Sequence, residues 1–301
     1  MSLVVDNLTK VFGSQVAVNH ISFTARPGEI LGFLGPNGAG KSTTMKMICG
    51  YHTPTSGTVV VSGYDIVNDK ISAQKEIGYL PESNPLYLDM YVREYLYFVA
   101  DIHQIKNKKN RISDLIEQTG LEKEQHKLIG QLSKGYKQRV GLAQALIHDP
   151  SVLIMDEPTS GLDMNQLVDI RTLIKNLGKE KTLMFSSHIM QEVQALCDRV
   201  IIINDGNLVA DDPIQKLKEE IDENYELLLK FEGGVDDQKL LQIEGVTEVN
   251  RQGEHVIVRY SKKMDLRPAI FRFCAAHEWV LIEMKLQDDS IENIFHKITS
   301  K

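Results

Sequence analysis

The sequence predicts an α/β protein with a mostly parallel sheet, followed by a small α+β domain. Over residues 1 to about 210, short apolar runs of strand length alternate with segments of helical periodicity. This alternation is typical of parallel strands joined by helical crossovers. From residue 225 onward the order becomes strand, helix, strand, strand, helix and strand, which is the order of a ferredoxin-like sandwich.

The elements of the first part follow from apolar spacing. Leu167, Ile170 and Ile174 recur at helical spacing, for example. A hairpin is predicted at Asp205-Gly206, because this pair accepts positive φ angles at little cost. We expect strands over residues 2–8, 29–34, 59–61, 152–155, 182–186 and 199–203, and helices over residues 41–49, 91–103, 111–119, 137–148 and 164–177.

The hairpin closes a first domain, expected at residues 1–213. A charged linker helix is predicted at 214–224, and an α+β accessory domain at 225–301. Within the accessory domain we expect strands over residues 225–231, 246–250, 255–260 and 280–285, and helices over residues 237–242, 266–276 and 290–298.

The composition is that of a globular protein. Of the 301 residues, 42% are hydrophobic and 25% are charged, so a core of ordinary size can form. The net charge of −7 disfavours nucleic acid as a partner, because phosphate backbones recruit basic surfaces. The cysteines Cys49, Cys197 and Cys274 lack metal-ligand spacing. No apolar run approaches the ~20 residues that cross a bilayer, and no signal segment is evident, so we expect a cytoplasmic protein.

A phosphate-binding loop is the clearest chemical motif. The segment fits the pattern G-x-x-x-x-G-K-[ST], follows an apolar run and opens a helical run. Glycines let backbone N–H groups turn toward phosphate oxygens, and the following helix directs its positive end at them. The lysine adds a full charge. The predicted ATP-binding residues are Gly35, Pro36, Asn37, Gly38, Ala39, Gly40, Lys41, Ser42 and Thr43.

Two acids and a histidine follow later strands. Asp156 and Glu157 end an apolar run, and His188 follows the expected strand at 182–186. Carboxyl ends of parallel strands meet at the edge where ligands bind. We expect Asp156 and the Ser42 hydroxyl to hold Mg²⁺, Glu157 to polarise the attacking water, and His188 to contact the γ-phosphate. Each residue alone has another interpretation, since an acid after a strand often caps a helix and a lone histidine is more often structural.

These motifs and three others resemble those of the ABC ATPase family over residues 1 to about 215. The others are residues 78–82 (GYLPE), residues 132–136 (LSKGY) and residues 160–163 (SGLD). The second of these is the signature that separates the family from other phosphate-loop proteins. The resemblance implies a mixed sheet with a RecA-like core and a helical subdomain at about 84–148. It also implies Mg²⁺-dependent ATP hydrolysis in a head-to-tail homodimer.

Further site residues come from the resemblance. Ser133 and Gly135 precede a helical run and would contact the ATP of the partner subunit, since a helix N-terminus attracts anions. Asp163 resembles the residue that couples the two sites. Phe12 stands where the family places an aromatic side chain on adenine, and a core position is the alternative.

The chain departs from the family pattern in the signature and in the 78–82 segment. Lys134 and Tyr136 replace glycine and glutamine in the signature. Glu82 replaces the glutamine that senses Mg²⁺ and contacts the membrane partner, and glutamate can still bind this ion as a hard oxygen ligand. Residues 33–35 and 79–82 resemble the drug- and polymer-export branch of the family. Residues 84–88, 91–96, 132–136 and 188–192 carry a finer resemblance, which is to the gliding-motility ATP-binding subunits of Bacteroidota.

The resemblance also implies an integral membrane permease as partner, which would hold the protein at the inner face of the cell membrane. The helical subdomain would grip this partner. Its aromatic side chains are interpreted either as that interface or as the subdomain core; they are Tyr87, Tyr91, Tyr95, Tyr97 and Phe98.

The accessory domain carries no chemical motif, and we interpret it as a dimer-stabilising or regulatory module. Two other functions compete with a transport ATPase. A soluble ABC ATPase acting on nucleic acid or ribosomes is disfavoured by the single phosphate loop and the acidic balance. A non-hydrolysing scaffold is disfavoured by the presence of Glu157 and His188.

Overall fold

The computed structural model describes residues 1–216, 224–261 and 264–287. The chain divides into two compact units, Met1–Ile214 and Gln215–Lys301, next to the boundary expected at residue 213. The linker helix expected at 214–224 lies largely outside the described residues, and the helix expected at 290–298 lies wholly outside them.

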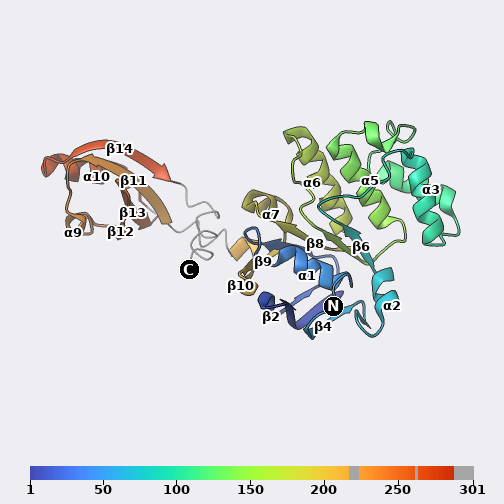
Figure 1. Ribbon diagram of the computed structural model, residues 1–301. Helices are drawn as coiled ribbons and strands as arrows, with labels where there is room; N and C mark the ends of the chain where they lie inside the picture. The colour runs from blue at the N-terminus through green and yellow to red at the C-terminus, as the bar shows by residue number, and fades with distance from the viewer. Residues whose placement is uncertain (217–223, 262–263, 288–301) are drawn as a thin grey trace. The chain divides into compact units, whose positions relative to one another are not determined.

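A six-stranded sheet forms the centre of the first unit, in the order β10-β9-β3-β8-β7-β6 (Figure 1). All neighbours are parallel except β10, which returns from β9 through the predicted hairpin. Every residue of β3, β7 and β8 is buried, as is usual for parallel strands covered on both faces. The strands are β3 (Ile30–Leu34), β6 (Ile77–Leu80), β7 (Val152–Met155), β8 (Thr182–Ser187), β9 (Arg199–Asn204) and β10 (Asn207–Pro213).

A second, antiparallel sheet lies on the α1 side of the central sheet (Figure 1). It consists of β1 (Leu3–Phe12), β2 (Gln15–Ala25), β4 (Ser56–Val61) and β5 (Tyr64–Asp65). Helix α1 (Lys41–Ile48) is packed with it in one apolar core, to which Val5, Phe33 and Met45 belong. The strand β2 was not expected from the sequence, and it turns out to supply residues to the functional site.

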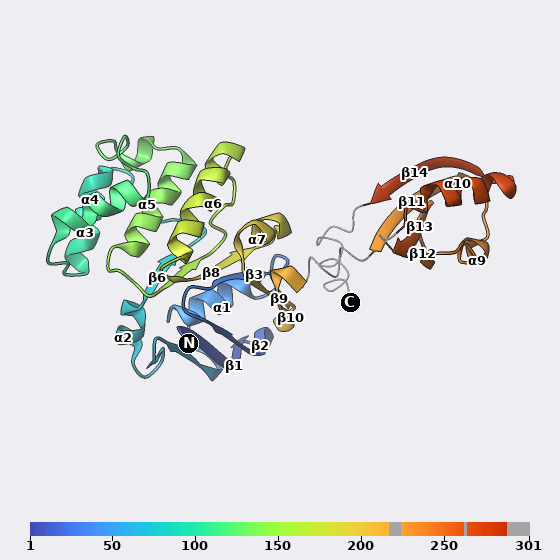
Figure 2. The same ribbon diagram turned by 180° about the vertical axis from the view of Figure 1, so that it is seen from behind.

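The remaining helices of this unit are α2 (Lys70–Lys75), α3 (Val92–Ile102), α4 (Lys108–Gln118), α5 (Lys134–Leu146), α6 (Met164–Gly178) and α7 (Met190–Leu196). Helices α3, α4 and α5 form a separate helical layer, seen from behind in Figure 2. Helix α5 begins at Lys134 and not at the expected residue 137, because Ser133 caps it and Gly135 is helical. The short elements α2, α7, β5 and β6 were not among the expected ones.

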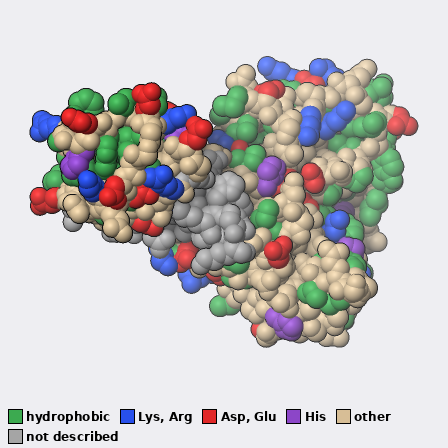
Figure 3. Space-filling model, turned by 60° about the vertical axis from the view of Figure 1, so that its left-hand side comes forward, with side chains coloured by type: hydrophobic (Ala, Val, Ile, Leu, Met, Phe, Trp, Pro, Cys, Tyr) green, Lys and Arg blue, Asp and Glu red, His purple; other side chains and the backbone are tan. Residues whose placement is uncertain are grey.

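The second unit contains one antiparallel sheet in the order β12-β13-β11-β14. Its chain order and strand order are those of the ferredoxin-like sandwich that the sequence predicts. The elements are β11 (Asn224–Glu232), α9 (Asp237–Leu240), β12 (Val246–Gln252), β13 (His255–Ser261), α10 (Arg267–Ala276) and β14 (Val280–Gln287). Helix α9 is a single turn, shorter than expected. On the face seen in Figure 3, acidic, basic and apolar side chains of this unit are intermixed.

Candidate functional site

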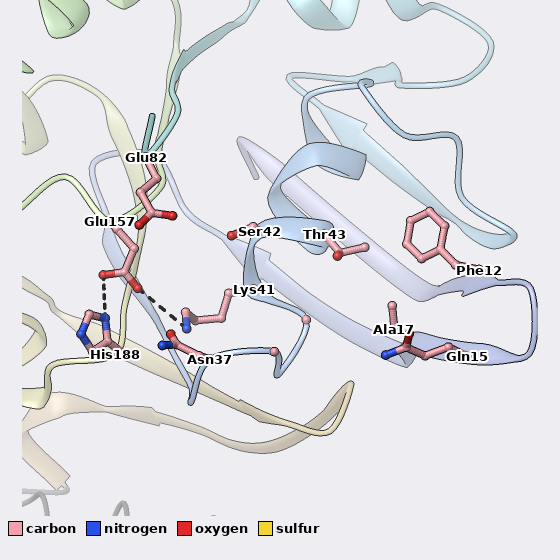
Figure 4. A pocket seen from close by; sticks show the side chains of 12 residues that line it. Phe12, Gln15, Ala17, Asn37, Lys41, Ser42, Thr43, Glu82, Glu157 and His188 are labelled. Carbon is pink, nitrogen blue, oxygen red and sulfur yellow. Dashed lines mark hydrogen bonds and ion pairs between the residues drawn. The ribbon is translucent and has the colours of Figure 1, made fainter. Parts of the chain in front are cut away.

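Three neighbouring strands of the central sheet end at one edge and build a pocket of about 410 Å³. The phosphate loop follows β3, the acids follow β7, and His188 follows β8, which lies between the other two strands. Figure 4 shows the side chains that converge there. The pocket is lined by Phe12, Gln15, Ala17, Asn37, Gly38, Gly40, Lys41, Ser42, Thr43, Glu82, Glu157 and His188.

The phosphate loop needs glycine at specific places. Gly40 has a φ of 107°, and a Cβ there would lie 2.6 Å from the Ala17 carbonyl oxygen. A Cβ on Gly35 would lie 2.4 Å from the carbonyl oxygen of Ile203. The loop therefore packs directly against β2 and β9, and a side chain would force these backbones apart. Three of the expected loop residues do not line the pocket, namely Gly35, Pro36 and Ala39.

Lys41 lies at the centre of the pocket and is 7% exposed. Its ammonium group donates to the carbonyl oxygens of Gly35 at 2.7 Å and Pro36 at 3.1 Å. Glu157 Oε1 lies 3.8 Å from Lys41 Nζ. Burial lowers the pKa of Lys41, and the charge of Glu157 opposes this shift most strongly. A cation that is held by carbonyl oxygens and partly desolvated is well suited to bind phosphate.

Glu157 is buried and points into the pocket beside His188 (Figure 4). Its Oε2 atom lies 3.0 Å from His188 Nδ1, whose N–H can donate to it. Burial raises the pKa of Glu157, and the hydrogen bond and charge of His188 act in the opposite direction. The backbone of Glu157 has a φ of 49°, in the left-handed region that is uncommon for residues other than glycine. A desolvated carboxylate beside an imidazole, carried on a strained backbone, has the chemistry of a general base.

Asp156 lies behind the pocket wall and is 3% exposed. Its Oδ1 atom accepts a 2.5 Å hydrogen bond from the Ser186 hydroxyl. Ser42 and Glu82, in contrast, line the pocket itself. Among the described residues no three acids, histidines or cysteines form a cluster that could hold a metal ion alone. A hydroxyl and two carboxylates nevertheless fit Mg²⁺, which in nucleotide sites takes few protein ligands and completes its shell with phosphates and water.

Phe12 lies at the opposite end of the pocket, near Gln15 and Ala17 of β2 (Figure 4). It is 46% exposed, so the alternative of a core position is wrong. The Lys10 ammonium lies 5.0 Å from the ring centroid. An exposed ring at a pocket mouth provides a surface on which a planar base can stack. Gln15 and Ala17 were missed because β2 was not expected.

The signature residues lie outside this pocket. Ser133 caps α5, and its Oγ accepts from the Tyr136 N–H and from Gln166 Nε2, both at 3.4 Å. Asp163 caps α6 by accepting from the Gln166 N–H at 2.9 Å. A Cβ on Gly135 would lie 2.8 Å from the Gln166 side chain. Gln166, which the sequence did not single out, therefore connects the signature residue Ser133 with Asp163, the predicted coupling residue.

The family model described as "ABC transporter" matches residues 18–160. The bacitracin transport ATP-binding protein BcrA of Bacillus licheniformis is 35% identical over 296 residues, which cover 97% of this chain and 95% of the relative. The linearmycin resistance ATP-binding protein LnrL of Bacillus subtilis is 32% identical over 307 residues, covering 98% and 97%.

Among solved structures, the chain is similar to cbiO1 from Clostridium perfringens, which is part of the ABC transporter complex cbiONQ. It has a TM-score of 0.66 and 28% identity over 73% of this chain and 92% of that one. Its likeness confirms the α/β cassette fold predicted from the sequence. The family model and these relatives place the chain among proteins that bind and hydrolyse ATP. The chain is thus an ATPase of the ABC transporter family and belongs to its ATP-binding subunits.

Proposed function

We propose that the chain powers an exporter, by closing as a homodimer around ATP and transmitting that closure to a separate membrane permease. The convergence of Lys41, Glu157 and His188 in one pocket carries the proposal. Relatives whose names refer to bacitracin transport and linearmycin resistance support export as the direction. A common lineage with the gliding-motility ATP-binding subunits of Bacteroidota is also proposed.

The pocket suits in-line attack of water on a terminal phosphoryl group. Lys41 and the loop N–H groups would bind the phosphates, and Phe12 would stack on adenine. Glu157 would accept the proton of the attacking water, while the His188 imidazole holds the carboxylate in place. Ser42, Glu82 and Asp156 would hold Mg²⁺, which would neutralise charge on the phosphates.

The dimer is proposed because the pocket lacks the signature. Ser133 and Gly135 lie at the N-terminus of α5, where backbone N–H groups and the helix dipole favour an anion. In a two-fold head-to-tail pair, the signature of one subunit can face the pocket of the other, so that each ATP is shared.

Complementation between two defective variants tests this sharing. Lys41→Ala impairs the pocket, and Ser133→Ala impairs the signature, so each variant alone should be nearly inactive. A mixed dimer contains one intact site, made of Lys41 from one subunit and Ser133 from the other. An equimolar mixture should therefore regain about a quarter of the wild-type sites, assuming random two-fold pairing. A mixture no more active than its two components would contradict a shared site.

The permease is proposed to contact a second pocket, of about 270 Å³, between α1, β6, α3 and α5. Two buried polar atoms there, Tyr79 Oη and His148 Nδ1, have no hydrogen-bond partner among the described residues. Buried polar groups normally have partners, so an inserted polar side chain is a suitable occupant. Tyr51 at the rim is 68% exposed.

The aromatic side chains of α3 and the preceding loop divide between the two roles considered for them. Tyr95 is 3% exposed and belongs to the core, whereas Tyr87, Tyr91 and Phe98 are each at least 40% exposed. The exposed ones are available to a partner.

No helix among the described residues is long and apolar enough to span a bilayer. Peripheral attachment at the cytoplasmic face of the membrane is therefore proposed through the permease.

Co-purification from membranes tests this contact. Tagged wild-type protein should bring down an integral membrane protein, and Tyr51→Asp should lose it while keeping ATP binding. The matched control is Tyr64→Asp, which changes an exposed tyrosine on β5 outside the second pocket. Equal recovery of the membrane protein with both variants would contradict the proposed contact.

A further inference from the structure

Ser186 lies beside the two acids of the site, on the neighbouring strand. Strands β7 and β8 are parallel, and their register pairs Met155 with Phe185. The residue after each of these, Asp156 and Ser186, therefore lies at the same level of the sheet edge. Ser186 is fully buried and does not line the pocket, so it would not touch a nucleotide directly.

One hydroxyl group contacts both acidic residues. Ser186 Oγ accepts from the backbone N–H of Glu157 at 3.0 Å and lies 2.5 Å from Asp156 Oδ1. An ionised carboxylate can only accept, so the hydroxyl proton is directed to Asp156. The hydroxyl thus uses its single donor on one acid and an acceptor lone pair on the next, and its orientation is determined.

We propose that Ser186 is a positioning residue for Mg²⁺-dependent hydrolysis, which holds both acids in their working orientations. Its donation to Oδ1 fixes the Asp156 carboxylate, and no hydrogen bond from the described residues occupies the other oxygen, Oδ2. Its acceptance from the Glu157 N–H stabilises the left-handed backbone, at a φ of 49°, that carries the Glu157 side chain toward His188. The inference rests on the proposed function of this pocket.

The neighbouring hydroxyl groups differ from this one. The Ser187 hydroxyl accepts from the Ile189 N–H at 3.0 Å, and its hydrogen bonds within the described part of the chain stay in the turn that follows β8. Thr182, also on β8 and also buried, donates to the Arg26 carbonyl oxygen at 3.1 Å. Thr182→Val therefore removes a buried hydroxyl from the same strand without touching either acid, and it is a matched control for Ser186→Ala.

The test separates metal-dependent from metal-independent binding. Binding of a fluorescent ATP analogue is measured in EDTA and during a Mg²⁺ titration, and Mn²⁺ affinity in the presence of ATP is measured by electron paramagnetic resonance. Ser186→Ala should leave nucleotide binding in EDTA unchanged. It should raise the metal concentration at the midpoint of the titration by about tenfold to a hundredfold, because metal affinity generally falls by that factor when a ligating carboxylate loses its hydrogen-bond partner. Thr182→Val should leave both measurements unchanged.

Two conservative variants keep the proposal testable if alanine impairs folding. Ser186→Thr retains the hydroxyl and should keep the midpoint metal concentration of the wild-type protein. Ser186→Cys offers only a weak donor and should raise that concentration. An unchanged metal midpoint in Ser186→Ala or Ser186→Cys would overturn the proposal, as would an equal loss of binding in EDTA. If the wild-type protein itself neither bound nor hydrolysed Mg-ATP, the proposed function would fail before the role of Ser186 arose.

Discussion

Replacing Glu157 by glutamine should stop hydrolysis while leaving ATP binding intact. The change preserves the shape of the side chain and removes the charge that faces His188 Nδ1 at 3.0 Å and Lys41 Nζ at 3.8 Å. A positioned general base contributes about 10² to 10⁴ in rate. Each factor of ten corresponds to ~1.4 kcal/mol of barrier, so the barrier should rise by ~3–5 kcal/mol. Phosphate release from purified protein measures the loss.

The pKa of Glu157 sets the pH dependence of both activity and stability. Burial raises it above the ordinary value of 4.5, against the opposing effects of His188 and Lys41. Catalysis needs the ionised form, so activity should increase as pH rises through this raised pKa. Stability runs the other way, because the folded state binds the proton more tightly than the unfolded state. The stabilisation that Glu157 contributes to the folded state is fully present below pH 4.5. It is lost as pH rises through the pKa of Glu157 in the folded protein.

Glu157→Gln cannot ionise and should therefore melt at a higher temperature than the wild-type protein at pH 7. Size-exclusion chromatography with ATP should also show a persistent dimer, since the nucleotide is not consumed. Near-normal phosphate release by this variant would refute the assignment of Glu157. An unchanged melting temperature at pH 7 would refute only the argument that burial raises the pKa of Glu157.

Three other changes test separate parts of the site. Phe12→Ala should weaken ATP binding by about tenfold, because stacking on one base contributes roughly 1–3 kcal/mol, and titration with a fluorescent analogue would detect it. Gln166→Ala removes the bond to Ser133 and should weaken the ATP-bound dimer several-fold, as expected for ~1 kcal/mol, without changing ATP affinity of the single chain. Deleting residues 215–301 should weaken dimerisation or alter ATPase regulation, and unchanged values of both would remove the roles proposed for the second unit.

The strands and helices that carry the chemistry could be predicted because their apolar patterns are continuous. The strand β2 could not, because the alternation of its buried residues is interrupted. Val18, Ile21 and Phe23 are buried, but the spacing changes from three to two where the register with β1 shifts. His20 has a φ of 48° at this irregularity. A bulge of this kind removes the period of two on which strand prediction depends.

The site also depends on contacts that a linear motif does not encode. Ser186 precedes His188 by two residues, and nothing in that spacing indicates that its hydroxyl contacts Asp156. The contact exists because β7 and β8 are adjacent and in register, which is a property of the assembled sheet. Gln166 was missed for the same reason, since its partner Ser133 lies 33 residues earlier on another helix.

The arrangement of the central sheet explains why a single strand, β8, contacts both acids of the site. Strand β8 lies between β3, which leads into the phosphate loop, and β7, which leads into the acids. It therefore presents the Ser186 hydroxyl to Asp156 and the His188 imidazole to Glu157 from a single backbone segment. Phe12 and the loop, which would grip the nucleotide, are supplied from the other side, by β1 and β3. Binding and hydrolysis groups thus come from different strands, so each can be altered without removing the other.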